Sequence, residues 1–276
     1  MHLRVGASTD TGRVRTLNED VYVLREDCGL FIVCDGMGGA PAGEVASQLA
    51  VDAILERLET GDEVDESADS ASSYLPWTNR LGEAVRRSNE VIYHHGQSDP
   101  RCAEMGTTVV GAWVNHHIAS VAHVGDSRAY LWHDNGLQLL TCDHSLVEEQ
   151  VRAGLLNRAQ SLESSQQNVL LRVLGGGPDV DVDLQEIPVV PGDYLLLCSD
   201  GLTRMVPDAA LADAIGRLRA PQHICDHLID TANRNGGADN ITAIVVEVTA
   251  GWWHRLAVRW RRFATGGYDA NAHSQV

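Results

Sequence analysis

The sequence has few aromatic and few basic residues, and it contains no long apolar run. Aromatic residues make up 5% of the 276, and 21 Lys and Arg stand against 38 Asp and Glu, for a net charge of −17. This charge argues against nucleic acid as a partner, because basic side chains make phosphate contacts. No run approaches the ~20 apolar residues of a membrane-spanning helix. The first residues, Met-His-Leu-Arg-Val-Gly, predict no signal peptide.

The six cysteines form no Cys-x-x-Cys pair and show no regular spacing, which argues against a zinc site. Cys34 and Cys198 end apolar runs, so we expect both to be buried thiols. This use of cysteine is typical of a reducing compartment. Together with the absence of a signal segment, it predicts a cytoplasmic protein.

Four aspartates stand beside short apolar runs, and each has a glycine or another small residue next to it or close by. Asp35 and Asp200 each follow such a run, Asp126 lies between Gly and Ser, and Asp239 shortly precedes another run. Any one of them is explained by a turn, since Asp and Gly both favour turns. As a set they predict a site for hard divalent cations, which prefer carboxylate, carbonyl and water oxygens.

Short motifs surround these aspartates in one fixed order. They are Thr9-Asp10-Thr11-Gly12, Arg15-Thr16-Leu17-Asn18-Glu19-Asp20, Asp35-Gly36-Met37-Gly38-Gly39, Gly106-Thr107-Thr108, Gly125-Asp126-Ser127-Arg128, Asp143-His144-Ser145, Ser199-Asp200-Gly201 and Asp239-Asn240-Ile241-Thr242. Over roughly residues 3 to 248 the series resembles the metal-dependent type 2C serine/threonine protein phosphatases in their compact bacterial form. The resemblance implies an α+β fold, a four-layer α-β-β-α sandwich of two antiparallel sheets flanked by helix pairs, with metals at one edge between the sheets.

The resemblance also implies a ligand set for Mn²⁺ or Mg²⁺. Asp35 would bridge two tightly bound ions, and the Gly36 carbonyl would bind one of them. Asp200 and Asp239 would hold the other. Asp126, with Asp200, would form a weaker third site.

Three further residues receive roles from the same resemblance. Glu19 and Asp20 would orient metal-bound water without touching the metals. Arg15 would grip the substrate phosphate bidentately, which Lys cannot do. Strand alternation would place Arg13 and Arg15 on one face, and the Arg-x-x-Asn spacing of the family selects Arg15.

The general acid is an open point. Relatives carry His two residues after the bridging aspartate or after the Gly-Gly, where this chain has Met37 and Ala40. We therefore expect metal-bound water, rather than a side chain, to protonate the leaving alkoxide. His144 is a poor substitute candidate.

The implied function is hydrolysis of phosphoserine and phosphothreonine in proteins by a metal-activated water at a binuclear centre, opposing a bacterial serine/threonine kinase. The partners would be phosphorylated proteins, namely the kinase and its substrates. The alternative is a catalytically weak signalling or binding module with the phosphatase fold. Such modules usually lack one or more of the metal-binding aspartates, whereas Asp35, Asp126, Asp200 and Asp239 are all present here. A small-molecule phosphomonoesterase is a third, weaker alternative.

Apolar patterning predicts the secondary structure, and Asn135-Gly136 predicts a hairpin turn. Residues 155–168 are polar and irregular, and the resemblance makes this region a mobile flap, with Ser164-Ser165 where relatives often carry His-Pro. Helices are predicted at 44–58, 77–95, 145–154, 208–218 and 222–233, and strands at 22–24, 30–33, 107–114, 118–124, 129–132, 137–140, 180–188, 194–198 and 241–248.

Two segments fall outside these elements. Residues 61–76 are rich in acids and serine and predict an exposed connector. We divide the chain into a phosphatase domain at 1–248 and a basic, aromatic tail at 249–276, helical at first and then disordered. The tail lies on an anionic membrane surface, binds a partner protein or folds back on the acidic body, and these alternatives stay open.

Overall fold

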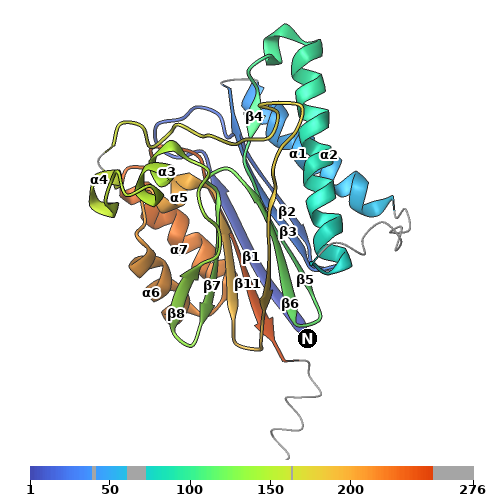
Figure 1. The fold of residues 1–276 in the computed structure, drawn as a ribbon. Helices are drawn as coiled ribbons and strands as arrows, with labels where there is room; N and C mark the ends of the chain where they lie inside the picture. The colour runs from blue at the N-terminus through green and yellow to red at the C-terminus, as the bar shows by residue number, and fades with distance from the viewer. Residues whose placement is uncertain (39–41, 61–72, 163, 251–276) are drawn as a thin grey trace, which may run out of the picture.

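Two antiparallel sheets pack face to face, and a pair of long helices covers the outer face of each (Figure 1). The computed structural model describes residues 1–38, 42–60, 73–162 and 164–250. The strands are β1 (His2–Asp10), β2 (Asp20–Arg25), β3 (Leu30–Met37), β4 (Gly106–Thr107), β5 (Val109–Asn115), β6 (Ile118–Val124), β7 (Arg128–His133), β8 (Gly136–Leu139), β9 (Asp183–Pro188), β10 (Tyr194–Cys198) and β11 (Ile241–Thr249). The helices are α1 (Ala42–Glu59), α2 (Pro76–Ser98), α3 (Leu146–Arg152), α4 (Arg158–Leu162), α5 (Asp200–Thr203), α6 (Asp208–Leu218) and α7 (Pro221–Arg234), with a 3-10 turn at Pro100–Cys102.

One sheet has the strand order β1-β11-β10-β7-β8, and the other has the order β2-β3-β5-β6-β9 with β4 paired to β3. Helices α1 and α2 lie against the second sheet, and α7 lies against β1 and β11 of the first. The predicted four-layer α-β-β-α sandwich is therefore confirmed.

The inner strands are apolar on both faces because a layer covers each face. In β3, Phe31 and Val33 belong to the core between the sheets, while Ile32 and Cys34 pack in the core under α1 and α2. This explains the continuous apolar run before Asp35. The prediction that Cys34 and Cys198 are buried is confirmed, since both are 0% exposed.

Most predicted elements are present, and several keep their bounds. The strands 118–124 and 194–198 and the helix 208–218 match β6, β10 and α6. The hairpin predicted at Asn135-Gly136 is present, but its turn lies one residue earlier. His133 pairs with Gly136, and Asp134 and Asn135 between them have positive φ, as a two-residue primed turn requires.

Three predictions of local structure were wrong. The strand at 107–114 is interrupted at Thr108, whose backbone N–H and side chain both bond to Asp35. Residues 155–168 contain the short helix α4, and α5 follows directly on Ser199, where no helix was predicted. Within the described ranges, no helix is long and apolar enough to cross a membrane.

Candidate metal centre and active site

Asp35 lies in the last part of β3, directly opposite Asp20 of β2. Hydrogen bonds fix its backbone from both sides. Its N–H donates to Thr108 Oγ1 at 3.1 Å, and its carbonyl accepts from Thr107 Oγ1 and the Thr108 N–H, both at 2.9 Å. The side chain is half-buried. Asp35 therefore presents a carboxylate from a rigid backbone at a partly open edge of the sandwich.

Asp20 is buried and joins the two sheets. Its Oδ2 accepts hydrogen bonds from Ser199 Oγ at 2.8 Å, directly after β10, and from Thr242 Oγ1 at 2.7 Å, in β11 of the opposite sheet. Its Oδ1 is buried and has no hydrogen-bond partner among the described residues. Burial raises the pKa of Asp20 to about 7, and the two hydroxyl donors offset part of that shift. A buried carboxylate oxygen without a protein donor is costly unless another group satisfies it.

Asp200 and Asp126 reach the same edge from different elements. Asp200 is the first residue of α5, after β10, and Asp126 lies in the turn between β6 and β7. Oδ1 of Asp200 is a second buried oxygen without a hydrogen-bond partner among the described residues. The other oxygen, Oδ2, forms an ion pair with Arg204. Both carboxylates are thus buried, and the charge of Arg204 neutralises them only in part.

Asp239 precedes β11 and forms a two-point ion pair with Arg15. Arg15 Nε lies 2.9 Å from Oδ1, and Nη2 lies 2.9 Å from Oδ2. Arg15 itself is 53% exposed in its side chain. These contacts use two of the five guanidinium N–H groups, so the others remain available to a phosphate.

Asn240 fixes the loop that carries Arg15. Its Nδ2 donates to the carbonyls of Thr11 (3.0 Å) and Leu17 (2.8 Å), and its Oδ1 accepts from the Glu19 N–H at 2.8 Å. Asn240 stands in the predicted motif Asp239-Asn240-Ile241-Thr242, but no role was predicted for it. The sequence feature that could have indicated this role is the position of Asn240, a polar residue between Asp239 and the apolar strand that follows.

Gly36 lies where three backbones meet. A Cβ on Gly36 would stand 2.2 Å from the Gly43 carbonyl oxygen and 2.8 Å from that of Glu19, so only glycine fits. A Cβ on Gly43 would in turn meet the Glu19 carboxylate at 2.5 Å. Burial raises the pKa of Glu19. The start of α1 and Glu19 are therefore packed tightly against the end of β3, beside Asp35.

The charges at this edge are of one sign and poorly solvated. Burial, followed by the charges of neighbouring aspartates, raises the pKa of Asp35. Burial and the Asp200 charge do the same for Asp126, and burial raises the pKa of Asp200 although Arg204 opposes it. Carboxylates held together in this way, with a buried oxygen on Asp200 and another on Asp20 that lack hydrogen-bond partners among the described residues, fit hard divalent cations. A pair of cations ~3.5–4 Å apart requires ligands on both sides of it rather than one convergent triad.

Two tighter clusters occur elsewhere in the described part of the chain. In the first, the ligand atoms of His123, His144 and Asp183 lie within 4.8 Å of one another. The Gly125 N–H donates to His144 Nδ1 at 3.0 Å, so the neutral ring carries its proton on Nε2, which faces Asp183 Oδ2 at 3.1 Å. That nitrogen has no lone pair for a metal. Both nitrogens of His144 are committed, and the residue is 7% exposed, as suits a poor general acid.

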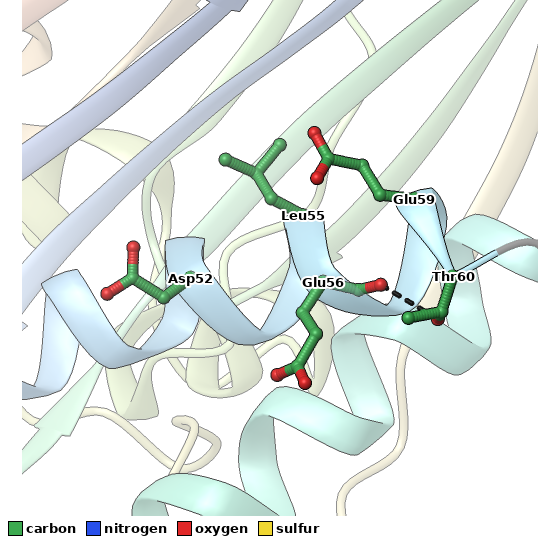
Figure 2. Close-up of a pocket in the computed structure, with 5 residues that line it drawn as sticks. All are labelled: Asp52, Leu55, Glu56, Glu59 and Thr60. Carbon is green, nitrogen blue, oxygen red and sulfur yellow. Dashed lines mark hydrogen bonds between the residues drawn. The ribbon is translucent and has the colours of Figure 1, made fainter.

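The second cluster is His95, Asp99 and Cys102, at the end of α2. Here both carboxylate oxygens of Asp99 are already engaged by Arg101, at 3.1, 3.2 and 2.7 Å. Figure 2 shows a further pocket, on the surface of α1. Its lining residues are Asp52, Leu55, Glu56, Glu59 and Thr60, none of which is a predicted ligand.

The expectation that strand alternation places Arg13 and Arg15 on one face was wrong, whereas the choice of Arg15, which rested on the Arg-x-x-Asn spacing of the family, stays a prediction. Residues 11–19 form turns and bends rather than a strand, so alternation does not apply to them. Arg15 contacts Asp239, whereas the Arg13 backbone N–H donates to the Gly237 carbonyl at 2.7 Å. Ala40 lies outside the described residues.

Comparison with known proteins agrees with this geometry. Residues 12–240 match the sequence profile of the family described as Protein phosphatase 2C. Serine/threonine phosphatase stp of Listeria welshimeri is 39% identical over 248 residues, which cover 87% of this chain and 93% of that protein. The Mycobacterium tuberculosis serine/threonine phosphatase PstP/Ppp has a TM-score of 0.80 at 32% identity, over 91% of this chain and 100% of that one.

A structure of the catalytic domain of PstP in complex with two manganese ions has a TM-score of 0.77 at 32% identity, over 90% of this chain and 99% of that one. This chain belongs to the protein phosphatase 2C family. It is a metal-dependent serine/threonine protein phosphatase.

Proposed function

We propose that Asp35, the Gly36 carbonyl, Asp200 and Asp239 bind two Mn²⁺ or Mg²⁺ ions at which phosphoserine and phosphothreonine in proteins are hydrolysed. The observation that supports this most is the convergence of carboxylates at one edge between the two sheets, whose charges act on one another. Among them the proposed ligand Asp200, and Asp20 opposite Asp35, each keep a buried oxygen without a hydrogen-bond partner among the described residues. The weaker third ion expected at Asp126 and Asp200 is a separate question, because Arg204 lies at these carboxylates.

Two divalent cations in such a cage supply a water of lowered pKa and positive charge for the phosphoryl oxygens. The protein's part is to position the reactants. Arg15, held by Asp239, presents its remaining N–H groups to the phosphate. Asp20, fixed by Ser199 and Thr242, and Glu19, fixed through Asn240, provide acceptors that orient water.

The physiological role proposed here is removal of phosphate that a bacterial serine/threonine kinase has added, within a phosphatase domain at 1–248. Its partners are that kinase and the kinase's substrates. Residues 251–276 and 61–72 lie outside the described residues, so peripheral membrane or partner contact by the tail remains a proposal from sequence. The weaker alternative, a binding module without turnover, predicts Mn²⁺ binding with no phosphate release.

Metal removal tests this function directly. The protein should release phosphate from a phosphoserine peptide in the presence of Mn²⁺ and should release none after chelation. Phosphate release should resume when Mn²⁺ or Mg²⁺ is restored, because every proposed ligand is a hard oxygen. Phosphate release is measured with the whole chain. Full turnover by the chelated protein would refute the metal cage, and metal binding without turnover would favour the binding module.

Arg15→Ala should raise KM for the phosphopeptide by about 10- to 100-fold with a smaller loss in kcat, since a hydrogen bond to a charged group contributes about 1.5–3 kcal/mol. The clamp binds ground state and transition state alike, so the effect falls on KM. Arg13→Ala is the matched control and should change KM little. If Arg15→Ala instead weakened Mn²⁺ binding and left KM unchanged, its role would be confined to Asp239.

A further inference from the structure

Arg204 lies one helical turn after Asp200 and returns to it. Its backbone N–H donates to the Asp200 carbonyl at 2.9 Å, at the end of α5. Side chains four residues apart lie on the same helix face. The Arg204 Nη2 accordingly forms an ion pair with Asp200 Oδ2.

The same nitrogen also reaches a second carboxylate. Arg204 Nη2 lies 3.4 Å from Asp126 Oδ2, across from α5 in the β6–β7 turn. The side chains of Asp126 and Arg204 are 8% and 26% exposed. One guanidinium nitrogen thus stands between two largely buried carboxylates that are separate in sequence and converge in space.

Among the described residues, the other arginine whose charge acts on Asp126 is committed elsewhere. Arg128 forms a two-point pair with Asp143, with Nε at 2.8 Å and Nη2 at 2.7 Å. Arg204 therefore supplies the positive charge that directly contacts both Asp126 and Asp200. Its charge opposes the effect of burial on the pKa of both carboxylates.

We propose that Arg204 is a built-in cation that takes the place of a third metal ion at Asp126 and Asp200. The inference rests on the proposed function, because it concerns the same cage. In this chain two metal ions suffice, and the guanidinium both neutralises Asp126 and competes with any further ion for it.

The test counts bound Mn²⁺ by equilibrium dialysis with metal analysis and locates the ions by anomalous scattering in crystals. The wild-type protein should bind two ions and show no scattering peak beside Asp126. Arg204→Gln should bind a third ion beside Asp126, with a dissociation constant at least about tenfold lower than that of the wild-type protein for the same ion. The reason is that a charge at this distance shifts the proton affinity of a carboxylate by about one to three log units. Adding Asp126→Asn to Arg204→Gln should abolish that third ion.

Two variants serve as matched controls. Arg204→Lys keeps the positive charge and should still bind two ions. Arg217→Gln removes an arginine from another i,i+4 pair, with Asp213 on α6 at 3.0 Å, and should leave the count unchanged. Mn²⁺ should also raise the melting temperature of Arg204→Gln more than that of wild type, because the variant leaves Asp126 and Asp200 unpaired.

The wild-type measurement decides the matter even if Arg204→Gln does not fold. A third ion beside Asp126 in the wild-type protein would overturn the role of Arg204 and leave the two-ion cage intact. Failure of wild type to bind any Mn²⁺ would overturn the cage and this inference together. An Arg204→Gln protein that folds and still binds only two ions would also overturn it.

Discussion

Asp35→Asn should lower the turnover of a phosphoserine peptide by more than about 100-fold while leaving the protein folded. Mutation of a residue that only orients a metal ligand already lowers metal affinity or activity by about 10- to 100-fold. Asp35 is itself the proposed ligand of both ions, so we expect a larger loss. Asn keeps the size of the side chain but lacks the negative charge that two cations share. The backbone hydrogen bonds of Asp35 to Thr107 and Thr108 do not involve its side chain, so the strand should persist.

Phosphate release and Mn²⁺ binding are measured side by side on wild type, Asp35→Asn and Asp52→Asn. Asp52 is an exposed aspartate of α1 that accepts a hydrogen bond from Gln48, and its substitution should change neither quantity. Wild-type turnover by Asp35→Asn would show that the ligand set is assigned to the wrong residues. Loss of activity with full metal binding would place Asp35 in a role other than the bridge.

Much of the fold could be predicted because the strands and helices follow local patterns. The runs before Asp35 and Asp200 are apolar at every position, and such strands must be covered on both faces. The structure covers them with a second sheet on one side and helices on the other. Helix α6 was predicted with its bounds unchanged, and the hairpin after β7 was predicted from turn-forming residues, although Asp134 and Asn135 rather than Asn135 and Gly136 form its turn.

The contacts of the site could not be predicted because they join residues far apart in sequence. Asn240 binds residues 11–19 across more than 200 positions, and Asp20 is held by hydroxyls of Ser199, directly after β10, and of Thr242 in β11. The break at Thr108 also depends on its pairing with Asp35, which no local pattern encodes. Spacing alone places Arg204 near Asp200, but only the fold brings Asp126 to the same nitrogen.

The metal-free protein should lose stability as pH rises from 5.5 to 8. The pKa values of Asp20, Asp35 and Asp126 are raised in the folded protein, that of Asp20 to about 7. In this pH range the folded state therefore binds more protons than the unfolded chain, and stability falls as these protons leave. The stabilisation is complete below the unfolded pKa near 4 and is lost as pH passes the folded values. For Asp20 alone we expect a loss on the order of 2 kcal/mol between pH 5.5 and 8.

That loss corresponds to about 4–8 °C in melting temperature for a chain of this size, measured by thermal unfolding in the presence of a chelator.

The variant Asp20→Asn isolates the contribution of Asp20, because Asn keeps an acceptor for Ser199 and Thr242 and removes the charge. Without metal, Asp20→Asn should be more stable than wild type at pH 8 and should show a flatter pH dependence. With Mn²⁺ the order should reverse, because the charge that destabilises the empty cage attracts the ions that fill it. Asp52→Asn should retain the wild-type slope. Two outcomes would contradict this prediction: a metal-free wild type that gains stability from pH 5.5 to 8, or an Asp20→Asn protein with an unchanged slope. Either would show that these carboxylates are solvated well enough to ionise freely. Their burial would then no longer argue for bound cations.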